Sequence, residues 1–302
     1  MSTPSVMETP VIETTNLCKT YGRTHAVRNL NLTVKSHGIT AFLGVNGAGK
    51  STTIKMLLGM IKPTEGSGKV LGHRIDDPVA SVDLRRKVAC VSEDKRLYGH
   101  MTVEQMIRFT SGFYPDWRPE VAGTLMRQFA LPPGRKVRDL SKGMRTMLAL
   151  LLAVSRRPAL LILDEPSEGL DPRGVEQLLE CLVVQCASGT SIFFSSHQIA
   201  EVERISDQIC VIHQGRLVLD APLEEIRQSW RHIDLVFPSI PDESYFQLAG
   251  VKRICTRERQ MSIFAGGNVE AIVERARGLQ ASTVDVTPVS LREIFLEAVE
   301  KT

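Results

Sequence analysis

The feature that most constrains this chain is a glycine-rich run at residues 44–51, with the sequence GVNGAGKS. Its glycines let the backbone bend so that several N–H groups point into one concavity. The run follows an apolar, strand-like segment at residues 40–43 and precedes a segment with helical spacing at residues 53–58. This order of strand, glycine-rich loop and helix N-terminus predicts a loop that binds the phosphates of a triphosphate.

Two side chains of this loop have spacings that predict direct roles. Lys50 is placed to reach the β- and γ-phosphates, and the hydroxyl of Ser51 is placed to ligate Mg²⁺. The predicted phosphate contacts are Gly44, Val45, Asn46, Gly47, Ala48, Gly49, Lys50, Ser51 and Thr52.

Length and composition are those of a globular protein with a sizeable core. The 302 residues are 43% hydrophobic and 24% charged, which leaves room for one large domain with a small one, or for two moderate domains. The net charge is +3 and no long basic run is present, so no nucleic-acid partner is expected. The longest apolar run, residues 147–154, is far short of the roughly 20 residues of a membrane-spanning helix. Any membrane role must therefore come through a partner.

The N-terminus and the cysteines give less specific information. Residues 1–10 are polar and lack a hydrophobic signal core, so we expect a flexible tail there. The six cysteines form no Cys-x-x-Cys pair, and no neighbouring histidine has ligand spacing. We interpret them as free thiols rather than as a zinc site.

Two apolar strands end in polar side chains that are suited to catalysis. Residues 159–163 precede Asp164 and Glu165, and residues 191–194 lead to His197. Buried parallel strands present functional groups at their C-terminal ends. We predict that Asp164 binds Mg²⁺ through water and that Glu165 polarises an attacking water. His197 would donate a hydrogen bond to a γ-phosphate oxygen.

Two other features are weaker signals when taken alone. Tyr21 lies in a turn between predicted strands, where its ring would either stack on a nucleotide base or pack within a hairpin. Residues 140–145, LSKGMR, place a serine and a glycine at the start of a predicted helix. That arrangement suits an anion, although serine is also a common helix cap.

Taken in order, these elements resemble the ATP-binding subunit of an ATP-binding-cassette (ABC) transporter over about residues 11–220. The resemblance is carried by Tyr21, residues 44–52, residues 140–144, Asp164 with Glu165, residues 169–171 and His197. It implies an α/β fold, a P-loop NTPase of the ABC type. Its parts would be a RecA-like parallel-sheet core, an antiparallel β subdomain and a helical subdomain at about residues 93–158. The implied activity is ATP hydrolysis, with Glu165, His197 and Lys50 as catalytic residues and with ATP and Mg²⁺ bound.

The resemblance also implies partners. Two copies of the chain would form a head-to-tail dimer that holds two ATP molecules between the subunits. Ser141 and Gly143 of one subunit would close over the γ-phosphate held by Lys50 of the other, and Asp171 would communicate across the interface. The other expected partner is an integral membrane permease, which would attach this cytoplasmic chain to the inner face of the cell membrane.

This sequence departs from the family pattern at two sites. The family signature is usually Leu-Ser-Gly-Gly-Gln, whereas Lys142 and Met144 replace a glycine and the glutamine here. Lys142 would either add charge near the nucleotide or project into solvent. Glu93 stands where the family has a glutamine that links Mg²⁺ and the attacking water to the helical subdomain. A carboxylate there can still ligate the metal.

Residues 221–302 are expected to form a small accessory α+β domain. Helices are predicted at residues 221–226, 269–279 and 291–299, strands at 232–237 and 284–286, and a hairpin at 254–265. Residues 288–295 resemble the ending of cassette subunits that pair with the type-2 class of membrane exporters. The segment contains no catalytic constellation, so we expect a role in dimer support or regulation.

The functional hypothesis is therefore an ATPase subunit that powers a separate membrane permease in export. The alternative is a soluble cassette ATPase that acts on a ribosome or on DNA, but the single cassette and the lack of a basic arm argue against it. A non-hydrolysing nucleotide sensor is disfavoured because both Glu165 and His197 are present.

Overall fold

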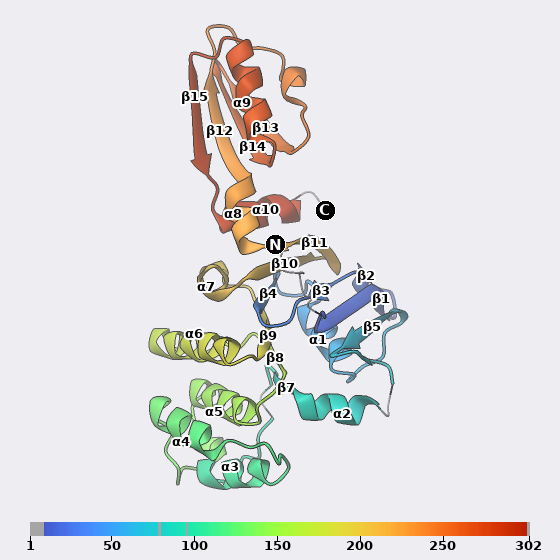
Figure 1. Ribbon diagram of the computed structural model, residues 1–302, viewed down its shortest axis with the longest axis vertical. Coiled ribbons are helices and arrows are strands. Elements are labelled where there is room, and N and C mark those ends of the chain that lie inside the picture. The colour runs from blue at the N-terminus through green and yellow to red at the C-terminus, as the bar shows by residue number, and fades with distance from the viewer. Residues whose placement is uncertain (1–8, 78–79, 95, 301–302) are drawn as a thin grey trace, which may run out of the picture. The chain divides into compact units, whose positions relative to one another are not determined.

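The computed structural model describes residues 9–77, 80–94 and 96–300, so most of the expected N-terminal tail lies outside the described residues. The chain separates into two units, the first ending at Asp220 and the second beginning at Ala221. The first unit contains two sheets and the second contains one, and each unit has its own helices (Figure 1).

A six-stranded sheet forms the centre of the first unit, in the order β11-β10-β4-β9-β8-β7. The strands are β4 (Ile39–Leu43), β7 (Val88–Val91), β8 (Leu160–Asp164), β9 (Ser191–Ser196), β10 (Gln208–His213) and β11 (Arg216–Pro222). All but β11 pair with their neighbours in parallel. Every residue of β4, β8 and β9 is buried, as expected for strands covered on both faces. The predicted parallel core is confirmed.

The register of these strands brings their C-terminal ends to one edge. Leu43 pairs with Ser196, and Asp164 pairs with Ser195. The phosphate-binding loop, the two carboxylates and the histidine therefore all leave the sheet on the same side. The helices α1 (Lys50–Leu57), α6 (Pro172–Ala187) and α7 (Ile199–Ile205) start just after these turns.

A second, antiparallel sheet carries the N-terminal strands, in the order β2-β1-β5-β6 with β3 paired to β1. Its strands are β1 (Ile12–Tyr21), β2 (Thr24–Leu30), β3 (Thr33–Val34), β5 (Glu65–Val70) and β6 (His73–Arg74). One core cluster includes Ile12 and Leu30 from this sheet and Phe42 and Ile162 from the parallel sheet. The antiparallel subdomain is thus fixed to the parallel core by shared apolar packing.

A helical subdomain is inserted between β7 and β8 (Figure 1). It contains α3 (Val103–Ser111), α4 (Pro119–Gln128), a short 3-10 helix (Val137–Asp139) and α5 (Lys142–Val154), and α2 (Ala80–Lys87) precedes β7. Thr102 starts α3 with a capping box to Gln105, and Pro119 starts α4. The predicted helical insertion is present.

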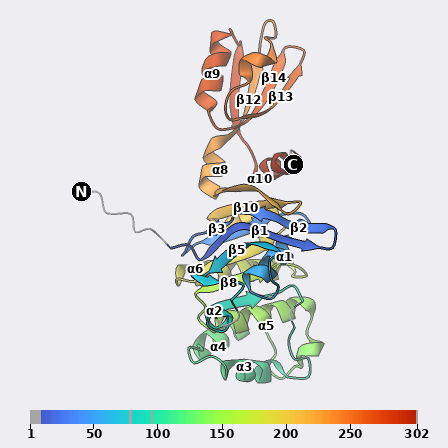
Figure 2. The same ribbon diagram turned by 90° about the vertical axis from the view of Figure 1, so that its right-hand side faces the viewer.

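The second unit is a four-stranded antiparallel sheet in the order β13-β14-β12-β15. Its strands are β12 (Trp230–Val236), β13 (Val251–Arg257), β14 (Gln260–Gly266) and β15 (Thr283–Pro288), and its helices are α8 (Leu223–Ser229), the 3-10 helix Glu243–Phe246, α9 (Val269–Gly278) and α10 (Leu291–Glu300). Figure 2 shows α9 against one face of this sheet. There Ile233 and Leu235 alternate with more exposed neighbours and pack with Ile263 and Ile272. The predicted α+β pattern, including the hairpin, is confirmed.

In the part of the chain that the structure describes, no helix is long and apolar enough to cross a membrane.

Candidate functional site

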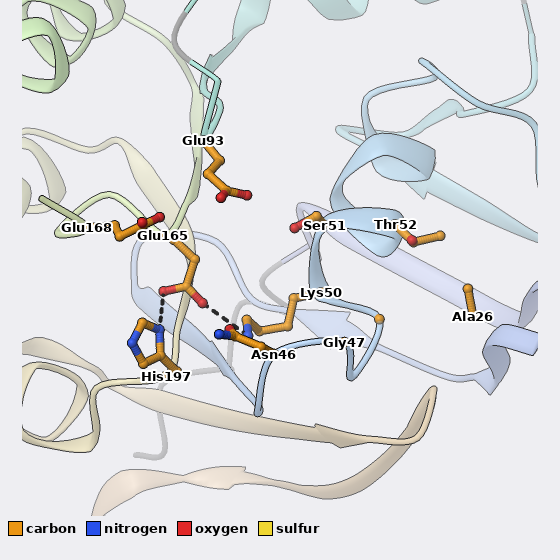
Figure 3. Close-up of a pocket in the computed structure, with 11 residues that line it drawn as sticks. Ala26, Asn46, Gly47, Lys50, Ser51, Thr52, Glu93, Glu165, Glu168 and His197 are labelled. Carbon is orange, nitrogen blue, oxygen red and sulfur yellow. Dashed lines mark hydrogen bonds and ion pairs between the residues drawn. The ribbon is translucent and has the colours of Figure 1, made fainter. Parts of the chain in front are cut away.

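A pocket of about 500 Å³ lies where the parallel strands end (Figure 3). It is lined by Ala26, Asn46, Gly47, Gly49, Lys50, Ser51, Thr52, Glu93, Glu165, Glu168 and His197. The structure therefore brings together side chains from the phosphate-binding loop, from the ends of β8 and β9 and from the segment after β7. We refer to this cavity as the loop pocket.

The conformation of the phosphate-binding loop requires its glycines. Gly49 has φ of 113°, and a Cβ atom there would lie 2.5 Å from the carbonyl oxygen of Ala26. A Cβ atom at Gly44 would lie 2.6 Å from the carbonyl oxygen of Ile212. Gly49 is also the N-cap of α1, so the first N–H groups of that helix lack acceptors within the helix. Such donors are suited to phosphate oxygens.

Lys50 is buried at the start of α1, with 6% of its surface exposed. Its Nζ donates to the carbonyl oxygens of Gly44 and Val45, at 2.6 and 3.2 Å. The same atom lies 3.0 Å from Oε1 of Glu165. A buried ammonium needs such partners, because an unpaired charge in the interior is costly. The loop thus holds the cation where a phosphate in the loop would meet it.

Glu165 is held between two basic side chains in a strained backbone conformation. Its φ is 46°, in the left-handed region that non-glycine residues seldom adopt. Oε2 of Glu165 lies 2.9 Å from Nδ1 of His197, and Oε1 faces Lys50 (Figure 3). If Nδ1 donates to this carboxylate, Nε2 can donate to a phosphate only when the ring carries both protons. The geometry thus links the proton on His197 to the charge on Glu165.

Asp164 lies beneath this pocket and does not line it. Its Oδ1 accepts a 2.7 Å hydrogen bond from Oγ of Ser195, and that same hydroxyl accepts from the backbone N–H of Glu165 at 3.0 Å. Ser195 therefore links the carboxylate of Asp164 to the backbone of Glu165. Ser195 was not among the predicted site residues, although its place at the end of an apolar strand was a usable signal.

Glu201 is a second residue that the sequence analysis missed. It lies on α7 and is buried, and this burial raises the pKa of its carboxyl group. A hydrogen bond with Ser167 acts in the opposite direction, and the nearby charge of Glu165 raises the pKa further. The turn after β8 is thus packed against a buried carboxyl group whose pKa lies above its ordinary value.

The oxygen donors around the loop pocket fit Mg²⁺. Ser51 and Glu93 line the pocket. Figure 3 shows that the carboxylate of Glu93 points toward the side of the pocket that Ser51 lines. Among the described residues, no cluster of three or more His, Cys, Asp or Glu side chains is arranged to hold a metal ion by itself. Mg²⁺ beside a nucleotide needs only one or two protein ligands, because phosphates and water supply the rest.

The predicted signature residues lie around a different cavity. Ser141, Gly143 and Asp171 line a pocket of about 340 Å³, which we call the signature pocket. Ser141 caps α5, since its Oγ accepts from the N–H of Met144 at 3.1 Å. Asp171 caps α6 by accepting from Gly174 at 2.7 Å. The residues of the loop pocket and those of the signature pocket therefore line two separate cavities of one chain.

Lys142 is half exposed and pairs with an acidic side chain of its own chain. Its Nζ lies 2.6 Å from Oε1 of Glu168, in the turn between β8 and α6. The side chain forms an ion pair within its own chain, so it neither projects freely into solvent nor lines the loop pocket.

Tyr21 is half exposed at the end of β1 and does not line the loop pocket. The ammonium of Lys19 lies 5.1 Å from the centroid of its ring. The ring is therefore accessible for stacking, and Lys19 adds positive charge beside it.

Each of the six cysteines is a free thiol. Burial raises the pKa of Cys90 and of Cys181 to about 12, so both stay protonated and unreactive near neutral pH.

Comparison with known proteins agrees with this geometry. Residues 27–168 match the family model described as ABC transporter. The chain is 33% identical over 222 residues to the bacitracin transport ATP-binding protein BcrA of Bacillus licheniformis, covering 72% of each protein. It is 30% identical over 298 residues to the uncharacterized ABC transporter ATP-binding protein YcbN of Bacillus subtilis (strain 168), covering 96% of this chain and 95% of that protein.

A solved structure gives the same result. The structure described as the ATP-binding subunit of an ABC transporter matches with a TM-score of 0.66 and 32% sequence identity. The match covers 72% of this chain and 92% of that one.

Proposed function

The chain belongs to the ABC transporter family as an ATP-binding subunit, and we propose that it hydrolyses ATP to power a separate integral membrane permease in export. The observation that carries the proposal is the loop pocket, where Lys50, Glu165 and His197 meet at the phosphate-binding loop. Similarity to BcrA, a bacitracin transport protein, supports a transport role.

The proposed chemistry starts from the contact between Lys50 and Glu165. A γ-phosphate in the loop would take a share of the Lys50 ammonium, leaving Glu165 with less positive charge beside it and more negative charge nearby. Glu165 then accepts a proton from the attacking water, while His197 and the loop N–H groups hold the phosphate oxygens.

We propose that Ser51 and Glu93 hold Mg²⁺ beside the phosphates and that Asp164 contacts it through water. The metal would neutralise part of the phosphate charge. Ser195 keeps Asp164 and Glu165 in fixed positions while charge develops.

We further propose that the chain works as a head-to-tail homodimer. The loop pocket and the signature pocket lie on one chain as separate cavities, each lined by part of the predicted nucleotide contacts. A second copy that presents Ser141 and Gly143 to the loop pocket would complete the ATP site, and Asp171 would lie at the same interface. Tyr21 would stack on the adenine base.

The permease is proposed to dock on a groove of about 600 Å³ that is lined by the helical subdomain on one side and by α1, the residues after it and β7 on the other. Leu97, Met106 and Leu152 line this groove, and Met60 lies at it with 61% of its surface exposed. Next to Leu97, the exposed rings of Tyr98 and Phe109 meet edge to face, with their centroids 5.3 Å apart. A groove that combines apolar and charged side chains and has exposed aromatic rings beside it is typical of a protein docking site. The chain would then sit in the cytoplasm, attached peripherally to the membrane.

A photo-cross-linking amino acid at Met60 tests this partnership. In the native host, we expect cross-links from this position to an integral membrane protein. The matched control is Val183, which is 45% exposed on α6 and does not line the groove. Cross-links from Met60 to a ribosomal protein would support the soluble alternative, and equal membrane cross-links from both positions would contradict docking at the groove.

A further inference from the structure

The ion pair between Lys142 and Glu168 joins the two predicted halves of the nucleotide site. Lys142 is the first residue of α5, directly after Ser141 of the signature. Glu168 is in the turn between β8 and α6, three residues after Glu165. The two side chains meet at 2.6 Å while about half of each remains in contact with solvent.

The backbone around this pair leaves the lysine little freedom. Gly169 has φ of 79°, and a Cβ atom there would lie 2.7 Å from Cδ of Lys142. The lysine stem therefore lies directly across Gly169 on its way to Glu168. Gly143 also packs closely on this turn, since a Cβ atom there would lie 3.2 Å from the carbonyl oxygen of Gly169. The start of α5 is thus seated on the turn that carries Glu168.

Glu168 itself lines the loop pocket, together with Glu93 and Glu165 (Figure 3). These three carboxylates would repel the negative charge of a triphosphate, so positive side chains are needed nearby to offset them. Lys50 and His197 already contact Glu165. Lys142 supplies positive charge to Glu168 from outside the pocket, because it lines neither the loop pocket nor the signature pocket.

We propose that Lys142 is the counter-ion of Glu168 and thereby sets the nucleotide affinity of its own chain's loop pocket, rather than contacting a phosphate held by a partner subunit. Lys142 is a positioning residue in this scheme, because it acts through Glu168. The inference rests on the proposed function, since it requires ATP in the loop pocket.

Binding of fluorescent N-methylanthraniloyl ATP and ADP to the purified full-length chain tests this inference. Lys142→Met removes the positive charge 2.6 Å from the Glu168 carboxylate, so we expect Kd for both nucleotides to rise about three- to tenfold, and less at high salt. Lys142→Met with Glu168→Gln removes both charges. We expect this double variant to bind as tightly as Glu168→Gln alone, which is the coupling expected of a pair.

The matched control is Arg204→Met, which removes a cation of 50% exposure from an ion pair with Glu176 on the surface of α6 and α7. Its nucleotide affinity should equal that of the wild type.

Two results would overturn the inference. One is a normal ADP affinity in Lys142→Met, as expected if the lysine acts only on a partner's γ-phosphate. The other is a weakened affinity that Glu168→Gln does not correct. Failure of the proposed function would look different: the wild-type chain would bind neither nucleotide, or Lys50→Met would bind both as well as the wild type.

Discussion

The two units of this chain build their sheets from similar apolar residues but use the strand ends differently. In the first unit the parallel strands all end at one edge, so Lys50, Glu165 and His197 converge although more than a hundred residues separate the first two. In the second unit neighbouring strands run in opposite directions, and their turns fall at both ends. Parallel pairing therefore concentrates polar groups at one place, and antiparallel pairing distributes them.

The two units also differ in the charged residues that they bury. The first unit buries Lys50, Asp164 and Glu165 side by side at the edge of its sheet, an arrangement that a purely structural core would avoid. In the second unit, Glu297 of α10 is buried and lies 3.6 Å from Arg253 of β13, which ties a helix to the sheet. We infer that the first unit carries the chemistry and the second supports it.

The largest expected effect is on hydrolysis by Glu165→Gln. The amide cannot accept the proton of the attacking water, so we expect kcat for ATP to fall by roughly 10²–10⁴-fold. Nucleotide affinity should stay the same or increase, because Lys50 no longer faces a carboxylate. Glu176→Gln is the control, since that glutamate is half exposed on α6 and pairs with Arg204. A Glu165→Gln variant that hydrolyses ATP near the wild-type rate would show that Glu165 is not the catalytic base.

A several-fold effect is expected at Glu93, on the opposite wall of the pocket from His197. Glu93→Gln removes a charge beside the proposed metal position, so half-maximal hydrolysis should need several times more free Mg²⁺. Binding of ATP without metal should be at least as tight as in the wild type. Superimposable Mg²⁺ titrations of the two proteins would show that Glu93 does not sense the metal.

The sequence was sufficient to predict the parts of the site that local patterns specify. The glycine pattern identified Lys50. Two short apolar runs that end in polar residues identified Glu165 and His197, because such runs are typical of buried parallel strands, whose C-terminal ends carry functional groups. It could not place Lys142 against Glu168, because that contact depends on how α5 sits on a turn 26 residues away. Glu201 was missed for a similar reason, since only tertiary packing buries it.

A smaller effect, on stability, is expected at Glu201. Burial raises the pKa of this carboxyl group above its ordinary value of 4.5, so folding favours the protonated form. Stability is therefore lost as pH rises from the unfolded-state pKa through the folded-state pKa. Glu201→Gln removes this loss and should raise Tm by about 1–3 °C near pH 8, and by less near pH 4.5. Calorimetry at the two pH values checks this, and an equal or larger gain at the lower pH would contradict it.

The smallest effect is expected from removing the second unit. A chain that ends at Asp220 retains every residue that lines the loop pocket, so its affinity for ATP should stay within about twofold of the full chain. Fluorescence titration of the folded truncation measures this, with circular dichroism as the control for folding. A folded truncation that fails to bind ATP would show that the second unit contributes to the chemistry after all.

The most direct test of the central claim, that the loop pocket and the signature pocket are two halves of one ATP site, is the molar mass of Glu165→Gln with saturating Mg-ATP, measured by size-exclusion chromatography with light scattering. We predict a dimer with ATP and a monomer without it. Adding Ser141→Arg to this variant should leave ATP binding intact but keep the protein monomeric, because the arginine would obstruct the surface offered to the partner. A Glu165→Gln protein that stays monomeric with ATP bound, or a double variant that dimerises equally well, would contradict the claim.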